Sequence, residues 1–105
     1  IIGPHIAVDH FGDNLLSALE TFSLELFCDG EFKEKGYGRN VLGSPITAVA
    51  HLLKLLQAQG DVAPIRAGEV ITTGTITKAY PIKSGEKWLT TLEGIALNGF
   101  ALSFA

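Results

Sequence analysis

One segment with a clear helical pattern, residues 43–60, limits the architectures open to this chain. Ser44 suits the N-cap position, Pro45 the first helical turn, and Gly60 the position just past the last turn. At 100° per residue most of the apolar side chains form one broad stripe, made of Ile46, Val49, Ala50, Leu52, Leu53 and Leu56. We therefore expect a helix that packs this stripe against a sheet and turns the opposite face, which carries His51, towards water.

The segment before this helix, residues 22–38, has the pattern of a β-hairpin. Asp29-Gly30 supplies the two residues of a tight turn, and residues 31–38 provide the returning strand. Alternate positions of the first strand carry side chains that suit one buried face, namely Phe22, Leu24, Leu26 and Cys28.

Three further strands are expected after the helix. They span residues 69–80, 87–93 and 97–104, with a loop over residues 61–68 before the first and a turn at Ser84-Gly85 before the second. A hairpin, a helix and three strands, in that order, predict an α+β domain with a mostly antiparallel sheet and one main helix.

The remaining residues and the composition fit one small domain. Residues 1–14 mix Gly, Pro and Asp with few apolar side chains and predict a short strand and a loop, and residues 15–22 predict a helical turn or a connector. With 105 residues, 47% of them hydrophobic, the chain has the composition of a globular domain with a buried core.

The charge and the cysteine content indicate which binding partners and which cellular compartment to expect. Eleven acidic and eight basic residues give a net charge of −3, without the basic cluster that would neutralise phosphates, so no nucleic acid partner is expected. Cys28 is the single cysteine, which excludes an internal disulfide and favours a reducing, cytoplasmic setting. We found no apolar run close to the roughly 20 residues of a membrane helix, so no membrane partner is expected.

The stretch Thr73-Gly74-Thr75 is the first candidate site. Glycine inside a strand lowers stability, so it indicates either a β-bulge at a sheet edge or a ligand that approaches the backbone. Two hydroxyl groups beside a bare backbone would suit a carboxylate. Ser44 is the second candidate, since the start of a helix can hold an anion, although Ser44 can equally be only the cap.

Other chemically capable residues give weaker patterns. The first segment carries four residues of types that can bind metals, namely His5, Asp9, His10 and Asp13. Their spacing matches no known metal-binding motif, so we expect these side chains to be exposed to solvent. Cys28 and Trp88 are expected in the core. The sequence contains no phosphate-binding loop, CxxC pattern or evident nucleophile–base pair.

Several stretches taken together resemble a known family over roughly residues 20–105. They are "LELFCDGEFKEKGYG" at 24–38, "VLGSP" at 41–45, "HLLKLLQAQG" at 51–60, "AGEVITTGT" at 67–75 and "PIKSGEKW" at 81–88. In order and spacing they resemble the C-terminal part of the 2-keto-4-pentenoate hydratase family, within the fumarylacetoacetate hydrolase superfamily.

The resemblance implies a mixed, mostly antiparallel β-sandwich or roll with one main helix. It also implies a homo-oligomeric enzyme that uses Mg²⁺ or Mn²⁺ and adds water to 2-hydroxypenta-2,4-dienoate-type acids in aromatic compound degradation. In such enzymes the Thr-Gly-Thr stretch binds the substrate carboxylate. Thr75 would inherit that contact, Thr73 and Gly74 would shape the approach, and the Ser44 helix start would be a second contact.

The chain also departs from the family pattern. The family holds its metal with a Glu-x-Glu pair that precedes the hairpin, and this chain contains no Glu-x-Glu, so residues 1–105 are expected to be the C-terminal segment of a longer hydratase-like domain. Arg39 replaces an expected small residue and would alter the pocket rim or pair with an acid. Two alternatives stay open: a 4-oxalocrotonate-type decarboxylase of the same superfamily, and a non-catalytic ligand-binding or assembly domain without a metal site.

Overall fold

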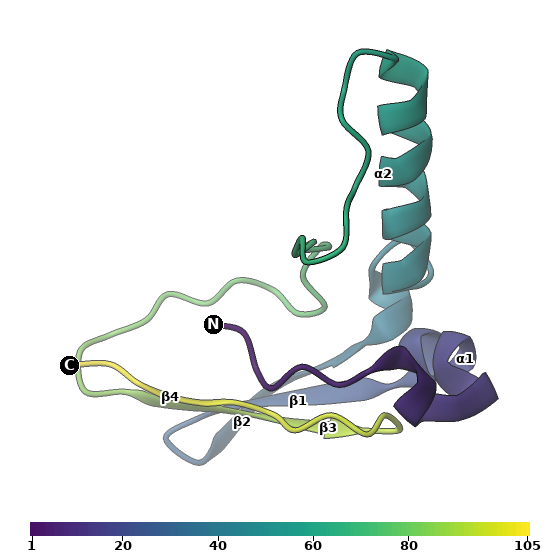
Figure 1. The fold of residues 1–105 in the computed structure, drawn as a ribbon. Coiled ribbons are helices and arrows are strands. Elements are labelled where there is room, and N and C mark those ends of the chain that lie inside the picture. Colours follow the sequence, from purple (N-terminus) through teal and green to yellow (C-terminus); the bar gives the residue numbers. More distant parts are fainter.

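The computed structural model describes residues 1–105 and has an α+β architecture, as the sequence predicted. Two helices and a four-stranded sheet are joined by long extended segments (Figure 1). In chain order the elements are η1 (Val8–Asn14), α1 (Leu15–Thr21), β1 (Ser23–Cys28), β2 (Glu31–Tyr37), η2 (Gly38–Asn40), α2 (Pro45–Gln59), β3 (Lys87–Glu93) and β4 (Ala101–Ser103).

The sheet is antiparallel, with the strand order β2-β1-β3-β4. The predicted hairpin is confirmed, and its turn residues Asp29 and Gly30 have φ angles of 48° and 81°, which suit a primed turn. Cys28 pairs with Trp88 of β3, and Trp88 pairs with Leu102 of β4. The sheet is thus built on the hairpin, and no second sheet covers it, so a sandwich or roll is not seen within this chain.

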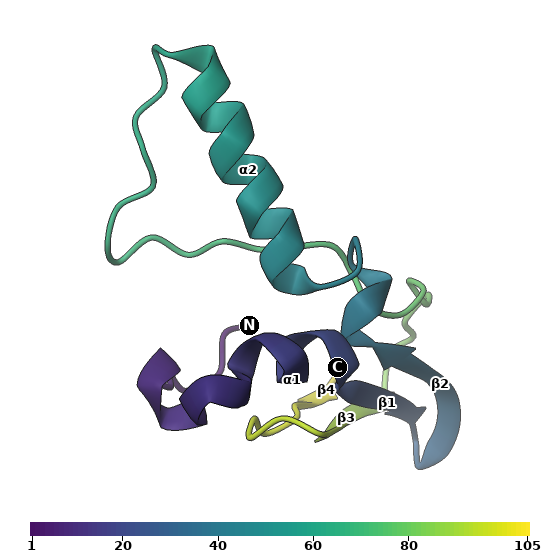
Figure 2. The same cartoon turned by 90° about the vertical axis from the view of Figure 1, so that its right-hand side faces the viewer.

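Helix α2 has the predicted bounds but not the predicted packing. It begins at Pro45, ends at Gln59 and has Gly60 at its C-cap with a φ of 67°. It rises away from the sheet instead of lying on it (Figures 1 and 2), and none of its residues is buried. Leu53, from the predicted core stripe, is 42% exposed. Periodicity shows which side chains share an apolar face, but it carries no information on which surface, if any, covers that face.

The stretch Gly38–Gln59 contains an 18-residue window with a mean hydropathy of 1.3 and, by length and composition alone, could cross a membrane, although the sequence analysis found no such run. Its continuous α-helix has only 15 residues. At 1.5 Å per residue that is about 22 Å, less than the roughly 30 Å of a bilayer core. Gly43, with a φ of 85°, interrupts the stretch before α2 begins.

Three other expectations need correction. Residues 69–80 form no strand, because they run extended without a hydrogen-bonded neighbour. The last strand is shorter than predicted and covers only Ala101–Ser103. The first segment contains the 3-10 helix η1 rather than a strand, and of the two alternatives for residues 15–22, a helical turn or a connector, the structure has the helix α1. The turn at Ser84-Gly85 is present.

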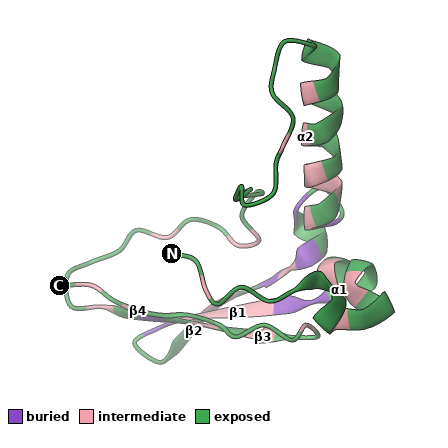
Figure 3. Ribbon diagram, in the orientation of Figure 1, coloured by how far each residue is buried: buried purple, intermediate pink, exposed green.

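The core of this chain is thin. Only 8 of 105 residues are buried, among them Cys28 and Trp88 as predicted, and most of the ribbon is exposed or half-buried (Figure 3). The radius of gyration is 15.9 Å, against about 13 Å for a compact domain of this length. Large apolar faces of α2 and of the sheet are therefore left without a covering layer.

Candidate functional site

The segment that carries Thr73-Gly74-Thr75 contacts the loop that precedes Ser44. After α2 the chain returns past the helix (Figure 2), and Gly74 lies against Val41 in the loop that leads into the helix. A Cβ placed on Gly74 would be 3.6 Å from Val41 Cγ1. The side-chain amide of Asn40 donates to the Ile76 carbonyl at 3.1 Å. Residues 74–76 thus contact residues 40 and 41, although the two stretches are more than 30 residues apart in the chain.

The Thr73-Gly74-Thr75 segment is open to solvent. All three residues are exposed, and none of their side chains forms a hydrogen bond within the chain. Because the segment belongs to no sheet, it is not a β-bulge, which was the alternative reading of the glycine. Its hydroxyl groups and the bare backbone of Gly74 are available to a ligand.

Ser44 behaves differently from an ordinary cap. It occupies the N-cap with extended backbone angles, and its carbonyl accepts from Thr47 N at 3.0 Å, but its side chain caps nothing. Ser44 is only 6% exposed, and its Oγ has no hydrogen-bond partner. A buried hydroxyl without a partner costs on the order of 1–3 kcal/mol. The start of α2 therefore carries an unpartnered polar group beside the positive end of the helix dipole.

A second polar cluster lies at the start of β3. The Glu86 carboxylate accepts from Lys83 N at 2.9 Å and from Trp88 Nε1 at 3.0 Å, and these two hydrogen bonds lower the pKa of Glu86. Burial, with the nearby Glu86 charge, raises the pKa of the Cys28 thiol. A thiol with a raised pKa is a poor nucleophile, so this cluster is structural.

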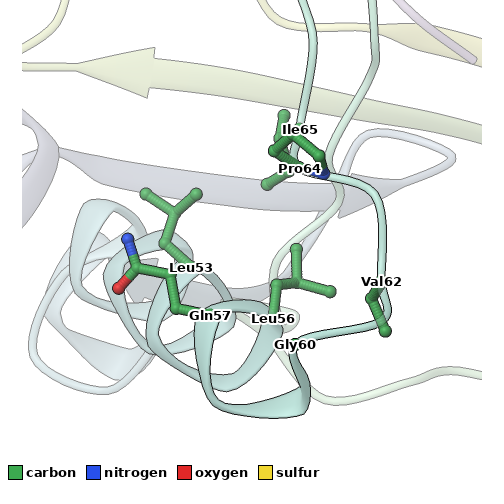
Figure 4. Close-up of a pocket in the computed structure, with 7 residues that line it drawn as sticks. All are labelled: Leu53, Leu56, Gln57, Gly60, Val62, Pro64 and Ile65. Carbon is green, nitrogen blue, oxygen red and sulfur yellow. The ribbon is translucent and has the colours of Figure 1, made fainter.

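The pocket between α2 and the loop that follows it offers no catalytic groups. It is lined by Leu53, Leu56, Gln57, Gly60, Val62, Pro64 and Ile65 (Figure 4). Gln57 supplies its only polar side chain, and no titratable residue reaches it. Its chemistry suits apolar contact rather than binding of an acid.

The chain does not present a binding site for a divalent metal ion. No group of three or more His, Cys, Asp or Glu residues is placed to hold one. The four candidate metal ligands of the first segment lie in η1 or just before it, and all of them are exposed. His51 on α2 is exposed as well. Arg39 pairs with no acid; its guanidinium lies 4.3 Å from the centre of the Tyr37 ring.

Comparisons with known proteins identify the relatives of this chain. No family model matches it. A 4-oxalocrotonate decarboxylase of Pseudomonas sp. (strain CF600) is 38% identical over 77 residues, which is 73% of this chain and 28% of that protein. A 2-keto-4-pentenoate hydratase of Dechloromonas aromatica (strain RCB) is 31% identical over 77 residues, 73% of this chain and 29% of that protein.

A solved structure agrees with these relatives. The 4-oxalocrotonate decarboxylase from Pseudomonas putida G7, complexed with magnesium and adipate, matches with a TM-score of 0.72 and 35% identity. The chain belongs to the 2-keto-4-pentenoate hydratase family and matches its C-terminal part. It spans less than a third of the length of these relatives, with 84% of this chain matching 32% of the decarboxylase. The same decarboxylase was also solved with calcium and acetate.

Sequence reasoning missed the contacts that hold the Thr73-Gly74-Thr75 segment in place. The Glu34 carboxylate of β2 accepts from Lys78 N at 3.1 Å and from the Tyr80 hydroxyl at 2.8 Å. Gly36 lies so close to the Ile76 carbonyl that a side chain there would clash with it. The only sequence signal was the pair of glycines in "KGYG", which marks a possible close approach without naming its partner.

Proposed function

We propose that this chain forms the substrate-carboxylate site of an enzyme that acts on small 2-oxo or 2-hydroxydienoate acids. The observation that carries the proposal is the buried, unpartnered Ser44 Oγ at the start of α2, together with the contact of Gly74 with Val41, three residues before Ser44. The magnesium–adipate and calcium–acetate complexes of the related decarboxylase support it, because both contain a carboxylate ligand and a divalent ion.

The residues of this chain would bind and orient the acid. Thr75 and Thr73 hydroxyl groups would donate to the carboxylate, and Gly74 would let it approach the backbone. The first turn of α2 would add N–H groups and a positive dipole end. Such uncharged donors stabilise the negative charge of the carboxylate without a positively charged side chain. Hydrogen bonds to an ionised group are stronger than hydrogen bonds between two neutral groups.

The relatives' structures support a divalent metal in the family, and Mg²⁺ or Mn²⁺ stays the predicted cofactor of the whole enzyme. The residues of this chain do not fit such an ion. The protein ligands of such an ion would therefore come from outside this chain.

Hydration is the reaction that we propose first. Water would add across the diene of 2-hydroxypenta-2,4-dienoate and give 4-hydroxy-2-oxopentanoate, as in aromatic compound degradation. Decarboxylation is the second candidate, because this chain is 38% and 36% identical to two 4-oxalocrotonate decarboxylases but 31% to the hydratase. That reaction would release CO₂ from 4-oxalocrotonate and leave a 2-hydroxydienoate.

The uncovered apolar faces of α2 and the sheet support a place inside a larger assembly. We propose a homo-oligomer in the cytoplasm, in which these faces are covered by protein. Size-exclusion chromatography with light scattering tests this, and a monomer at micromolar concentration would contradict it.

The function is tested by binding and by turnover. In calorimetry, the wild-type chain is expected to bind adipate, and Ser44→Ala is expected to bind it at least threefold more weakly, because the carboxylate loses the hydrogen bond that the Ser44 hydroxyl would donate. Turnover is followed with the purified protein as consumption of 2-hydroxypenta-2,4-dienoate and as CO₂ release from 4-oxalocrotonate, each with Mg²⁺. Carboxylate binding with no turnover of either acid would favour the non-catalytic binding domain, and no binding would refute the proposal.

A further inference from the structure

Residues 73–80 lack the support that a sheet would give them. Their backbone pairs with no strand, so their position depends on other contacts. Three residues supply these contacts, and all three lie on β2 or directly after it: Glu34, Gly36 and Asn40. We call these three residues the β2 clamp.

Glu34 makes the strongest of the contacts. One carboxylate oxygen accepts from Lys78 N at 3.1 Å and the other from the Tyr80 hydroxyl at 2.8 Å. The hydrogen bond from the hydroxyl to Glu34 stabilises neutral tyrosine and raises the pKa of Tyr80. The Tyr80 ring also packs beside Trp88, with the ring centroids 5.8 Å apart. One carboxylate thus fixes two points of the segment against the sheet.

The other two clamp residues act nearer the candidate site. Asn40 donates to the Ile76 carbonyl at 3.1 Å, one residue beyond Thr75. Gly36 allows that carbonyl to approach the backbone of β2, and the Thr77 methyl would lie 3.1 Å from a Cβ at Gly36. Asn40 also lies directly before the loop that leads into α2. Residues 34–40 therefore hold the Thr73-Gly74-Thr75 segment and also lead into the start of α2.

We propose that the β2 clamp positions Thr73–Thr75 beside the start of α2, with Glu34 as its main positioning residue. This inference rests on the proposed function, since it states how the carboxylate-binding segment is held in its binding position. Glu34 itself touches no substrate and acts through the backbone of residues 76–80.

The test compares Glu34→Ala with Glu31→Ala in the full chain. Glu31 is a matched control, because it lies on the same strand, its side chain is 77% exposed, and its carboxylate forms an ion pair with Lys33 at 3.4 Å and no bond to residues 73–80. Glu34→Ala is expected to speed amide hydrogen exchange at Lys78 by about tenfold, to shift the amide signals of Gly74 and Thr75, and to weaken adipate binding by about tenfold, the ratio that 1.4 kcal/mol corresponds to. Glu31→Ala should change none of these.

A spectroscopic readout separates positioning from general destabilisation. In Glu34→Gln the ring signals of Tyr80 should titrate at lower pH than in the wild type, because the charge that raises the pKa of Tyr80 is removed. If Glu34→Ala fails to fold, Tyr80→Phe removes only the hydroxyl and keeps the ring beside Trp88. It is expected to weaken adipate binding by about threefold.

The outcomes separate the two proposals. Faster exchange at Lys78 together with unchanged Gly74 signals and unchanged adipate affinity would overturn the positioning role. If the wild type binds no adipate, the proposed function fails, and positioning is judged by the Gly74 and Thr75 signals alone. Those signals support it if they move in Glu34→Ala and refute it if they stay.

Discussion

Gly74→Ala separates the binding role of this glycine from its effect on folding. The structure makes alanine acceptable at this position, because Gly74 has no positive φ and a new Cβ would lie at an ordinary 3.6 Å from Val41 Cγ1. Removing a glycine where alanine fits stabilises a protein by about 0.4–1 kcal/mol through the unfolded chain. We therefore expect the free energy of unfolding to stay equal or rise slightly.

Ligand binding should respond in the opposite direction. The methyl group would stand where the carboxylate approaches the backbone, and loss of one hydrogen bond to a charged group costs about 1.5–3 kcal/mol. The dissociation constant for adipate should therefore rise by about tenfold to a hundredfold. Chemical denaturation measures stability, calorimetry measures affinity, and Thr72→Ala is a control just outside the site. Equal affinity in a folded Gly74→Ala protein would refute a close approach at Gly74.

Three further predictions concern residues around the site. Thr75→Val should keep the fold and weaken carboxylate binding by about 1–3 kcal/mol, measured as affinity or as the substrate requirement of the active enzyme; unchanged values would remove Thr75 from the site. Gly36→Ala should lower the free energy of unfolding by about 1–3 kcal/mol, because the new methyl group would clash with the Ile76 carbonyl. Amide hydrogen exchange should become faster in residues 76–80 and not in β1; unchanged exchange in residues 76–80 would contradict the close contact. The lowered pKa of Glu86 means that its stabilisation is present above the ordinary value of 4.5 and is lost as pH falls through the folded-state pKa; Glu86→Gln should flatten the acid limb of stability against pH, and an unchanged limb would contradict this.

The hairpin and α2 were predictable because their signals are local. Asp29-Gly30 favours the backbone angles of its own turn, and Ser44, Pro45 and Gly60 mark helix ends without help from distant residues. The failed strand at 69–80 shows the opposite case. Its β-branched residues favour an extended backbone, but a strand also needs a hydrogen-bonding neighbour, which residue pattern alone does not provide.

The candidate site was predictable in its parts but not in its arrangement. Thr73-Gly74-Thr75 and Ser44 were recognised separately from residue type, whereas the contact of Gly74 with the loop before Ser44 depends on the path of the chain after α2. The Glu34 contact to Tyr80 joins residues 46 positions apart, and a Glu among the charged residues of a strand gives no sign of such a role in the sequence. The missing cover on α2 is equally non-local, since an apolar stripe looks the same whether or not a partner lies on it.

The most direct test of the carboxylate site is a nuclear magnetic resonance titration of the ¹⁵N-labelled chain with adipate, with and without Mg²⁺. The account predicts saturable shifts that are largest at the amides of Thr73, Gly74 and Thr75 and in the first turn of α2, with little change in η1 or at the apolar pocket. Because this chain has no metal-binding group of its own, Mg²⁺ should leave those shifts nearly unchanged. Shifts confined to other residues, or none at all up to millimolar adipate, would contradict the central claim.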